Sequence, residues 1–425
     1  MYKRPKGTRD ILPQDAQIWQ LMENAVKQTA REYNISEIRT PIFEDVSLFL
    51  RSVGESSDIV NKEMYVFKDK GDRTMALRPE GTAGVVRACI ENGLFNSPLP
   101  LKLWYLGNNY RYENPQSGRY REFTQFGVEY FGNDSPLMDA ELILLIRDIL
   151  TKLGVDNYQI QINSIGCREC RQVYNSQIRE FAQNNLDKLC DDCKHRASIN
   201  PLRMLDCKNE NCQKVLQDLP KLKDTMCDDC RQHFEALTSI LDEFKVPYIV
   251  NPNLVRGLDY YSRTVFEFVA EIDGKTLTFA GGGRYDYLVE EMDSSPMPAC
   301  GFAIGLDRLK YLVQNNNAQS QLVYIANAGN VRVFECFKLA NVLRSAGLNI
   351  EVNLNHRSFK AQMKYVDKIN ARYLVVVGDD ELANNVFTVK NLYTGEDCVV
   401  PAQNLIEYLS LTDEELKKVR KFAEF

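Results

Sequence analysis

The feature that most constrains this chain is a pair of alternating segments within residues 104–131. Apolar and polar residues alternate up to Arg111, the pattern breaks over residues 114–118, and alternation resumes at Phe123. A period of two is typical of half-buried strands, and a short break rich in Asn, Pro, Ser and Gly is typical of a turn. The sequence therefore predicts a long β-hairpin.

Three arginines, two glutamates and a glutamine of this hairpin share one side, because they occupy odd-numbered positions and every second residue of a strand points to the same face. They are Arg111, Glu113, Arg119, Arg121, Gln125 and Glu129. Burying such charges without partners is too costly for a core face. The pattern favours a face that binds a polyanionic ligand with amine-like donors, and a solvated, charged hairpin is the alternative.

Other blocks along the chain carry similar chemistry. One places a carboxylate and a hydroxyl between a strand-like segment and a predicted helix, where they can hold an ammonium group or simply cap the helix: Glu80, Gly81 and Thr82. Residues 255–261, VRGLDYY, combine an arginine with two tyrosines, and residues 281–286, GGGRYD, permit close approach to a ligand.

The order of these blocks resembles the class II aminoacyl-tRNA synthetases, and RGLDYY and GGRYD are similar to segments of the histidyl-tRNA synthetase family, bacterial type. Residues 5–13, PKGTRDILP, resemble the opening of the same family. The resemblance implies an α+β fold. An antiparallel-sheet catalytic domain would span residues 1–321, with a helical insertion at about 167–246, and a C-terminal α/β anticodon-binding domain would span residues 322–425.

The resemblance also implies an activity. A histidine–tRNA ligase activates histidine with ATP and Mg²⁺ to histidyl-adenylate and transfers it to the 3′ end of tRNA(His). One alternative is a catalytically silent paralogue that senses histidine as a regulatory subunit of histidine biosynthesis, although such paralogues generally lack the anticodon domain. A second is a synthetase for another amino acid, such as proline or threonine.

Individual roles carry over by resemblance onto numbered positions. The catalytic residues would be Arg111, Arg256 and Gln125. Histidine would contact Glu80, Gly81, Thr82, Gln125, Glu129, Arg256, Tyr260, Tyr261 and Tyr285, and ATP would contact Arg111, Glu113, Arg119, Arg121, Phe123 and Arg308. Transfer RNA would meet Gln116, Arg119 and Arg121 at its acceptor end and Arg357 and Lys360 at its anticodon.

The imidazole ring gives this assignment a physical rationale. It carries two distinct nitrogens, so a carboxylate from Glu129 on one and a phenol from Tyr261 on the other would select it. A site built to hydrogen-bond a group rejects analogues that lack it.

Eight of the chain's 12 cysteines lie in the predicted insertion: Cys167, Cys170, Cys190, Cys193, Cys207, Cys212, Cys227 and Cys230. Three pairs are Cys-x-x-Cys and the fourth has four residues between, which is typical of thiolate ligands of zinc. Structural zinc in two four-cysteine sites and inert buried thiols are the two alternatives. The spacing leaves the pairing open.

Charge and hydropathy place further limits on the chain. The net charge is −6, so a tRNA would have to be held by local basic patches. No apolar segment approaches the roughly 18 residues of a membrane span, and the first thirty residues lack a signal core, so we expect a cytoplasmic protein without a membrane partner. By resemblance, a helix at residues 14–33 and a strand at residues 38–43 would form a homodimer interface.

Overall fold

The computed structural model describes residues 2–54, 57, 59–116, 118–313, 322–355 and 357–411. The chain divides into two compact units, residues 1–314 and 315–425. The polar segment that we expect to link the domains, residues 314–321, lies outside the described residues.

An eight-stranded sheet forms the centre of the first unit, in the order β1-β5-β6-β11-β10-β9-β7-β8. The predicted hairpin is confirmed as β5 and β6, which pair antiparallel from Leu101 opposite Phe131 to Tyr110 opposite Glu122. Every neighbouring pair from β5 to β7 is antiparallel, and short β1 and β8 add parallel edges. The strands are β1 (Ser36–Glu37), β5 (Leu101–Tyr110), β6 (Glu122–Phe131), β7 (Gln159–Ser164), β8 (Ile249–Val250), β9 (Ser262–Ile272), β10 (Lys275–Arg284) and β11 (Ala299–Gly305).

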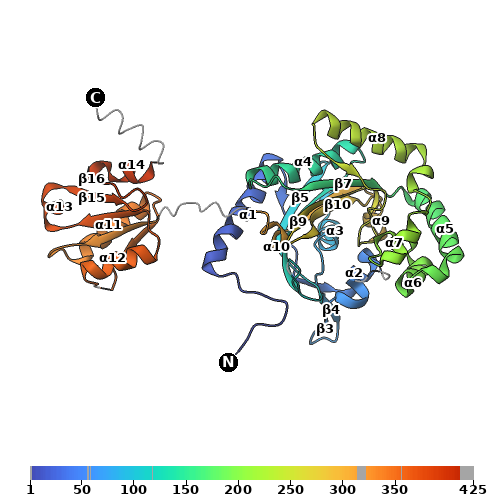
Figure 1. Cartoon of the computed structure of the whole chain (residues 1–425), viewed down its shortest axis with the longest axis horizontal. Helices are drawn as coiled ribbons and strands as arrows, with labels where there is room; N and C mark the ends of the chain where they lie inside the picture. The colour runs from blue at the N-terminus through green and yellow to red at the C-terminus, as the bar shows by residue number, and fades with distance from the viewer. Residues whose placement is uncertain are drawn as a thin grey trace. The chain divides into compact units, whose positions relative to one another are not determined.

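Helices α1 (Pro13–Glu32) and α4 (Pro136–Lys152) pack together against this sheet (Figure 1). Helix α4 starts with Ser135, whose hydroxyl accepts a hydrogen bond from the backbone of Leu137, and with a proline in its first turn. Its buried face joins the largest core cluster, which includes Ile146, Val128 and Phe266. The other face of the sheet is left to form a cavity.

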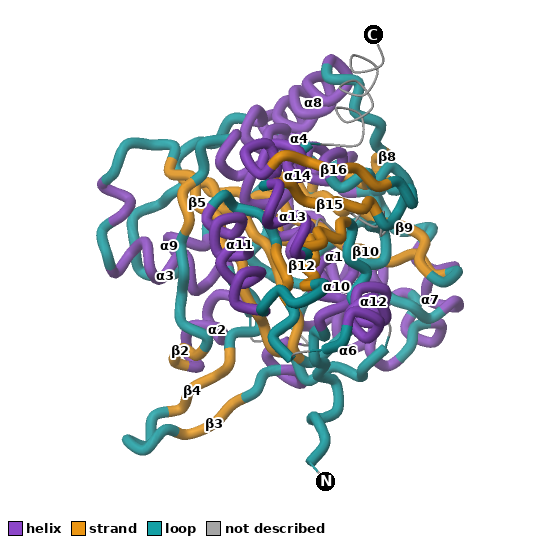
Figure 2. The backbone as a smooth tube through the Cα atoms, turned by 90° about the vertical axis from the view of Figure 1, so that its left-hand side faces the viewer, coloured by secondary structure: helices purple, strands orange, loops and turns teal. Residues whose placement is uncertain are grey.

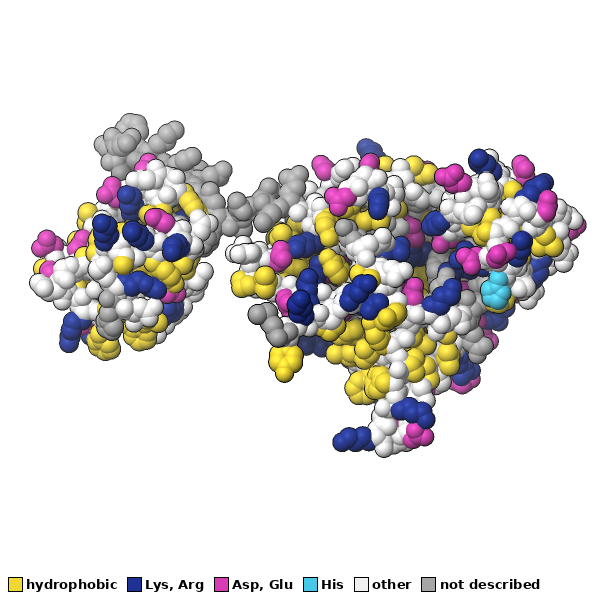
Figure 3. Space-filling model, turned by 60° about the horizontal axis from the view of Figure 1, so that its bottom comes forward, with side chains coloured by type: hydrophobic (Ala, Val, Ile, Leu, Met, Phe, Trp, Pro, Cys, Tyr) yellow, Lys and Arg dark blue, Asp and Glu magenta, His cyan; other side chains and the backbone are white. Residues whose placement is uncertain are grey.

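A smaller, three-stranded sheet consists of β2 (Phe43–Asp45), β4 (Thr74–Leu77) and β3 (Val66–Lys68), with α2 (Val46–Val53) beside it. Its β3–β4 hairpin projects from the unit (Figure 2). Phe43 and Val66 are more than half exposed, at 54% and 51%. Hydrophobic side chains gather beside the projecting hairpin in Figure 3.

The strand that we expect at residues 38–43 is not formed. Strand β1 ends at Glu37, β2 begins at Phe43, and the chain between them passes over Arg78. The guanidinium of Arg78 donates to the carbonyl oxygen of Thr40 at 3.0 Å, so a side chain takes the acceptor that a neighbouring strand would use.

The insertion between β7 and β8 contains four α-helices: α5 (Arg168–Asn184), α6 (Asp191–Ile199), α7 (Glu210–Leu216) and α8 (Asp228–Glu243). Figure 1 shows them in green, along one side of the first unit. Further α-helices of this unit are the ten-residue α3 (Thr82–Glu91) and the single turns α9 (Leu288–Glu291) and α10 (Leu306–Leu309).

The second unit is an α/β sandwich, as the sequence predicts. Its sheet has the order β13-β12-β14-β15-β16, with the first three strands parallel and the last two antiparallel. Buried clusters lie on both faces, which explains the continuous apolar run of β14. The strands are β12 (Val323–Asn327), β13 (Ile350–Val352), β14 (Tyr373–Val377), β15 (Val386–Asn391) and β16 (Asp397–Pro401); the helices are α11 (Val333–Ser345), α12 (Phe359–Lys368), α13 (Asp379–Asn384) and α14 (Leu405–Ser410).

Across the described residues, no helix is both long enough and apolar enough to cross a membrane.

Candidate active site

A cavity of about 910 Å³ opens on the central sheet of the first unit. The hairpin, strands β9 to β11, the segment before α3, the loop before β9 and the insertion all contribute to its wall. Fourteen of the residues predicted to bind histidine or ATP line it: Glu80, Gly81, Thr82, Arg111, Glu113, Arg119, Phe123, Gln125, Glu129, Arg256, Tyr260, Tyr261, Tyr285 and Arg308.

Glu129 lies buried at one end of the cavity, where hydroxyl groups surround its carboxylate. Thr82 donates to it at 2.7 Å and Tyr105 at 3.3 Å, and Tyr285 donates to its other oxygen. Gly301 lies opposite on β11, where a Cβ atom would collide with the carboxylate. Burial raises the pKa of Glu129 to about 8.

The tyrosines around Glu129 remain donors. Burial and the Glu129 carboxylate keep the pKa values of Tyr105 and Tyr285 well above that of an ordinary tyrosine. Tyr260 lies next to them, and its ring centroid is 4.8 Å from that of Tyr261. This end of the cavity is therefore an aromatic, hydroxyl-rich pocket around one carboxyl group.

Glu80 fixes the entry to helix α3. One of its oxygens accepts from the backbone N–H of Thr82 at 2.7 Å and the other from that of Ala83 at 2.8 Å. Two of the N–H groups that lack an intrahelical partner at the helix start are thereby satisfied. Burial raises the pKa of Glu80 because it disfavours the ionised carboxylate. A cationic ligand beside this group would stabilise the ionised form.

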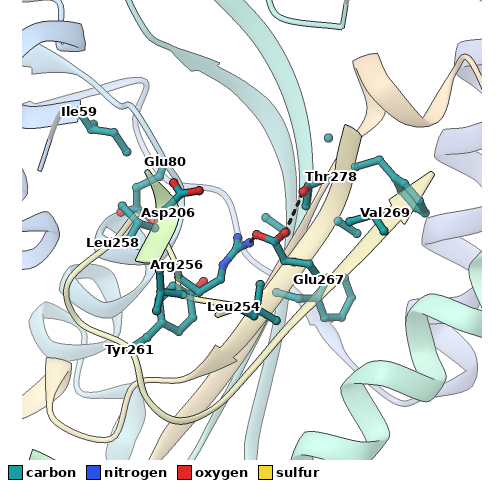
Figure 4. A pocket seen from close by; sticks show the side chains of 18 of the residues that line it. Ile59, Glu80, Asp206, Leu254, Arg256, Leu258, Tyr261, Glu267, Val269 and Thr278 are labelled. Atoms are coloured by element: carbon teal, nitrogen blue, oxygen red, sulfur yellow. Dashed lines mark hydrogen bonds and ion pairs between the residues drawn. The ribbon is translucent and has the colours of Figure 1, made fainter. Parts of the chain in front are cut away.

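Arg256 lies in the loop before β9 and forms an ion pair with Glu267 of β9 (Figure 4). Thr278 of β10 donates to the second oxygen of Glu267 at 2.8 Å. Gly281 makes room for the guanidinium, since a Cβ atom there would lie 2.6 Å from it. Burial opposes the charge of Arg256, but Glu267 together with Tyr261 and Tyr260 outweighs it, and the pKa of Arg256 is raised.

Two other arginines are held by backbone oxygens instead. Arg111 donates to the carbonyl of Pro79 at 2.9 Å, and Arg308 donates to the carbonyl of Gly118 at 3.1 Å. A carbonyl orients a guanidinium without cancelling its charge, so both remain available to an anion. The guanidinium of Arg111 also lies 5.4 Å from the ring centroid of Phe123, which lines the cavity beside it.

Two polar side chains of the hairpin complete this region. The side-chain oxygen of Gln125 accepts from Asn109 at 2.7 Å, which leaves its amide nitrogen as a donor toward the cavity. Glu113 lies 3.6 Å from Arg119 in a loose ion pair.

Some predicted site residues lie outside this cavity. Arg121 stacks on Tyr112 at 3.6 Å and donates to the carbonyl of Glu113, and it is absent from the described lining. Gln116 forms a backbone bridge with Arg119 at the tip of the hairpin. In the second unit, Arg357 stacks on Tyr365 at 3.9 Å and Lys360 is exposed. The eight cysteines gather in two groups of four.

Sequence reasoning missed several lining residues. Tyr105 occupies an odd position of the same hairpin, opposite Gly127 and beside Glu129, so the alternation contained its signal. Glu267 also lines the cavity, as the one acidic residue within the apolar part of β9, residues 265–270. Arg203, Lys208 and Gln213 of the insertion carried no comparable signal.

The sequence and the fold of this chain are similar to those of known proteins. A family model described as histidyl-tRNA synthetase matches residues 7–309, and one described as an anticodon binding domain matches residues 322–411. The chain belongs to the histidyl-tRNA synthetase family. The predicted family and the predicted class II fold are both confirmed.

Relatives of this family match almost the whole chain. A histidine–tRNA ligase of Clostridium novyi is 46% identical over 96% of this chain and 98% of that protein. Another, from Thermoanaerobacter pseudethanolicus, is 48% identical over 93% and 96%. The crystal structure of apo histidyl-tRNA synthetase from S. aureus superposes on this chain with a TM-score of 0.79 and is 36% identical in sequence. The match covers 96% of this chain and 100% of the S. aureus chain.

Membership of the family makes the chain an aminoacyl-tRNA ligase for histidine and implies ATP, histidine and tRNA as its ligands. A silent regulatory paralogue is less well supported, because the relatives are ligases and the match continues through the anticodon domain.

Proposed function

We propose that the cavity binds histidine at its Glu129 end and ATP along Arg111, Phe123 and Arg308, so that the amino acid carboxylate meets the α-phosphate between them. The observation that carries this proposal is the shared wall, in which one cavity joins a hydroxyl-bound carboxyl group to three guanidinium groups. A zwitterionic amino acid with a polar ring and a polyphosphate need opposite charges at the two ends.

Histidine would be recognised by its ring. An imidazole N–H donates to Glu129, and the hydroxyl of Tyr261 contacts the second ring nitrogen. The cluster of Glu80, Thr82 and Tyr260 receives the α-ammonium group, whose positive charge compensates the buried carboxyl groups. Gln125 orients the substrate with its free amide nitrogen.

Activation is then an in-line displacement. A carboxylate oxygen of histidine attacks the α-phosphorus of ATP, and the bond to the bridging oxygen breaks, which releases pyrophosphate and leaves histidyl-adenylate. Arg111 and Arg256 stabilise the charge that develops on the α-phosphate oxygens. In the second step, a terminal ribose hydroxyl of tRNA attacks the histidyl carbonyl carbon, and AMP leaves. Protein side chains form no covalent bond in either step.

The proposal includes Mg²⁺, which neutralises charge on the β- and γ-phosphates when bound. Glu113 fits such an ion best, because its carboxylate lines the cavity and is only loosely paired with Arg119. Oxygen ligands of this kind, together with phosphates and water, suit Mg²⁺. Structural Zn²⁺ in the cysteine-rich insertion belongs to the same proposal.

The proposal extends to the larger partners. Gln116, Arg119 and Arg121 at the hairpin tip contact the acceptor end of tRNA(His), and Arg357 and Lys360 contact its anticodon loop. The chain acts as a cytoplasmic homodimer. Exposed apolar side chains on the small sheet, Phe43 and Val66 among them, support an interface between copies.

The test is ATP–pyrophosphate exchange with the purified chain, offered one amino acid at a time without tRNA. Exchange with histidine alone, lost by about 10²-fold or more in Arg256→Ala, is expected. No exchange with retained histidine binding would favour the regulatory paralogue, and exchange with proline or threonine would favour another synthetase.

A further inference from the structure

The eight cysteines of the insertion form two compact groups. Within each group the sulfur atoms lie within 4.8 Å of one another. One group joins the two ends of the insertion, and the other lies within it: Cys167, Cys170, Cys227 and Cys230 in the first, and Cys190, Cys193, Cys207 and Cys212 in the second. The first and last pairs in the sequence thus come together around the middle two.

The sulfur separations fit one metal ion in each group. The sulfur of Cys167 lies 3.5 Å from that of Cys170 and 4.0 Å from that of Cys227, and the sulfurs of Cys190 and Cys207 are 3.8 Å apart. A zinc–sulfur bond of about 2.3 Å gives a tetrahedron with edges of about 3.8 Å. Disulfide sulfurs would be about 2.05 Å apart.

Backbone N–H groups already point at the sulfurs, and they do so across the chain. Cys167 donates from its N–H to the sulfur of Cys230 at 3.2 Å, and Cys227 donates to the sulfur of Cys170 at 3.1 Å. In the second group Cys190 donates to the sulfur of Cys212 at 3.1 Å. Such bonds stabilise thiolates and orient them toward a metal.

Inert thiols explain this arrangement less well. A core needs only apolar contact from its cysteines, whereas here four polarisable groups converge on one point and accept reciprocal hydrogen bonds. Four thiolates in such a space repel one another unless a cation lies between them. Soft sulfur ligands in a tetrahedron select zinc or iron, and zinc suits a closed, structural site.

We propose that the insertion binds two structural zinc ions with this nested pairing, and that the ions hold the insertion against the loop that binds histidine. The first ion lies at the root of the insertion. Gly166, next to Cys167, accepts from the backbone of Arg263 at 2.8 Å, and a Cβ atom at this glycine would lie 2.6 Å from the side chain of Cys170. This site therefore ties α5 and α8 to strands β7 and β9.

The second ion lies beside the cavity. Lys208, directly after Cys207, and Gln213, directly after Cys212, both line the cavity. Asp206 shares that lining with Arg256 (Figure 4). A metal bound by Cys207 and Cys212 fixes both ends of this part of the cavity wall.

Insertion side chains then hold the loop from Leu254 to Tyr261 by its backbone. Arg171 of α5 donates to the carbonyl oxygens of Tyr261 and Asp259, and Arg203 donates to that of Gly257 at 3.0 Å. Asn200 bonds the carboxylate of Asp259 at 2.7 Å. The loop carries Arg256 and Tyr261, so the shape of the proposed histidine pocket depends on the insertion.

The first experiment counts metal in the full chain, purified without added zinc, by inductively coupled plasma mass spectrometry. Two zinc ions per chain are expected, and denaturation with a chelator should release both. Absence of metal would overturn the proposal, and iron in place of zinc would overturn the choice of metal.

Two four-cysteine variants test the pairing. Serine replaces Cys167, Cys170, Cys227 and Cys230 in variant one, and Cys167, Cys170, Cys190 and Cys193 in variant two. The nested pairing predicts one zinc in variant one and none in variant two. Pairing of neighbours along the chain predicts the reverse, and the remaining pairing predicts none in either.

Crystals of the unaltered chain provide the same test if a variant does not fold. Anomalous scattering at the zinc edge should give two peaks, each about 2.3 Å from the four sulfurs of one group. A peak shared between the groups would contradict the nested arrangement.

The bracing effect rests on the proposed function and is measured separately. Arg171→Ala should retain two zinc ions and raise KM for histidine roughly tenfold in pyrophosphate exchange, with KM for ATP changed less than about twofold. Arg179→Ala, in the same helix, is the matched control and should behave as the unaltered chain. Equal changes for both substrates in Arg171→Ala, or none, would overturn the bracing without affecting the zinc count.

Discussion

At one end of the cavity hydroxyl groups surround the buried carboxyl group of Glu129, whereas at the other end carbonyl oxygens hold the guanidinium groups of Arg111 and Arg308. In both arrangements the hydrogen-bonding partners are neutral. Burial raises the pKa of Glu129 to about 8, although the hydroxyl donors act in the opposite direction, and burial lowers the pKa of Arg308.

The two ends of the cavity therefore suit different ligands. A hydroxyl can donate to an ionised carboxylate or accept from a protonated carboxyl group, so the hydroxyls around Glu129 stabilise either state, and Glu129 can accept a hydrogen bond from a ring N–H. Carbonyls fix the direction of a guanidinium, which stays charged because its pKa is so high. The end that reads an amino acid is titratable, and the end that neutralises phosphate is permanently cationic.

The largest expected effect breaks the cationic end. Arg111→Ala should lower kcat of pyrophosphate exchange by about 10²- to 10³-fold, because a guanidinium aimed at developing charge acts mainly in the transition state. Steady-state exchange at saturating histidine and ATP measures it.

Arg121→Ala is the matched control for this change. This arginine belongs to the same hairpin but stacks on Tyr112 outside the described lining of the cavity. Exchange should stay within about twofold of the unaltered chain. An equal loss of exchange activity in Arg111→Ala and Arg121→Ala would mean that lining the cavity does not distinguish a catalytic arginine from a peripheral one.

Glu129→Gln tests the titratable end. KM for histidine should rise about 30- to 100-fold while KM for ATP stays constant, since the lost interaction is a charge-assisted hydrogen bond worth about 2–3 kcal/mol. Glu113→Gln should show the opposite pattern and change the ATP and Mg²⁺ dependence alone. A loss of ATP affinity in Glu129→Gln would contradict the division of the cavity.

The raised pKa of Glu129 makes stability depend on pH. Between about pH 4.5 and pH 8 the unfolded glutamate is ionised while the folded one keeps its proton, so unfolding releases a proton and rising pH favours it. Relative to Glu129→Gln, the unaltered chain should lose up to about 1.4 kcal/mol of unfolding free energy per pH unit. Urea denaturation at several pH values measures this difference.

Histidine sharpens the same measurement. Burial removes water from Glu129, and a bound imidazole supplies a hydrogen-bond donor in its place. Saturating histidine should therefore reduce the difference between the two chains in the slope of unfolding free energy against pH. A slope that stays the same with histidine would place the ligand elsewhere.

Much of the fold followed from the sequence because local patterns determine it. The alternation of the hairpin, the apolar face of α4 and the strand–helix order of the second unit depend on neighbouring residues alone. The strand expected at residues 38–43 is interrupted where Arg78, far along the chain, donates to the carbonyl oxygen of Thr40. A contact of this kind has no local signal.

The site divides in the same way. Residues on one strand face, such as Gln125 and Glu129, share a cavity because the pleat places them together. Arg121 also has an odd number, but it precedes strand β6, so the strand pleat does not determine its direction. Its guanidinium lies over the ring of Tyr112, outside the described lining of the cavity. Pairing of the cysteines depends on how the helices of the insertion return, which spacing cannot give.

The smallest expected effect concerns Tyr105, which donates a hydrogen bond to Glu129. Tyr105→Phe removes one of the three hydroxyl groups that donate to Glu129. This hydrogen bond, at 3.3 Å, is longer than that from Thr82 at 2.7 Å. Its loss should raise KM for histidine about fivefold, equivalent to about 1 kcal/mol. Tyr110→Phe, on the same strand but bonded to Glu122, is the control and should leave KM unchanged. If Tyr105→Phe exceeds Glu129→Gln in its effect, the phenol rather than the carboxylate selects the ring.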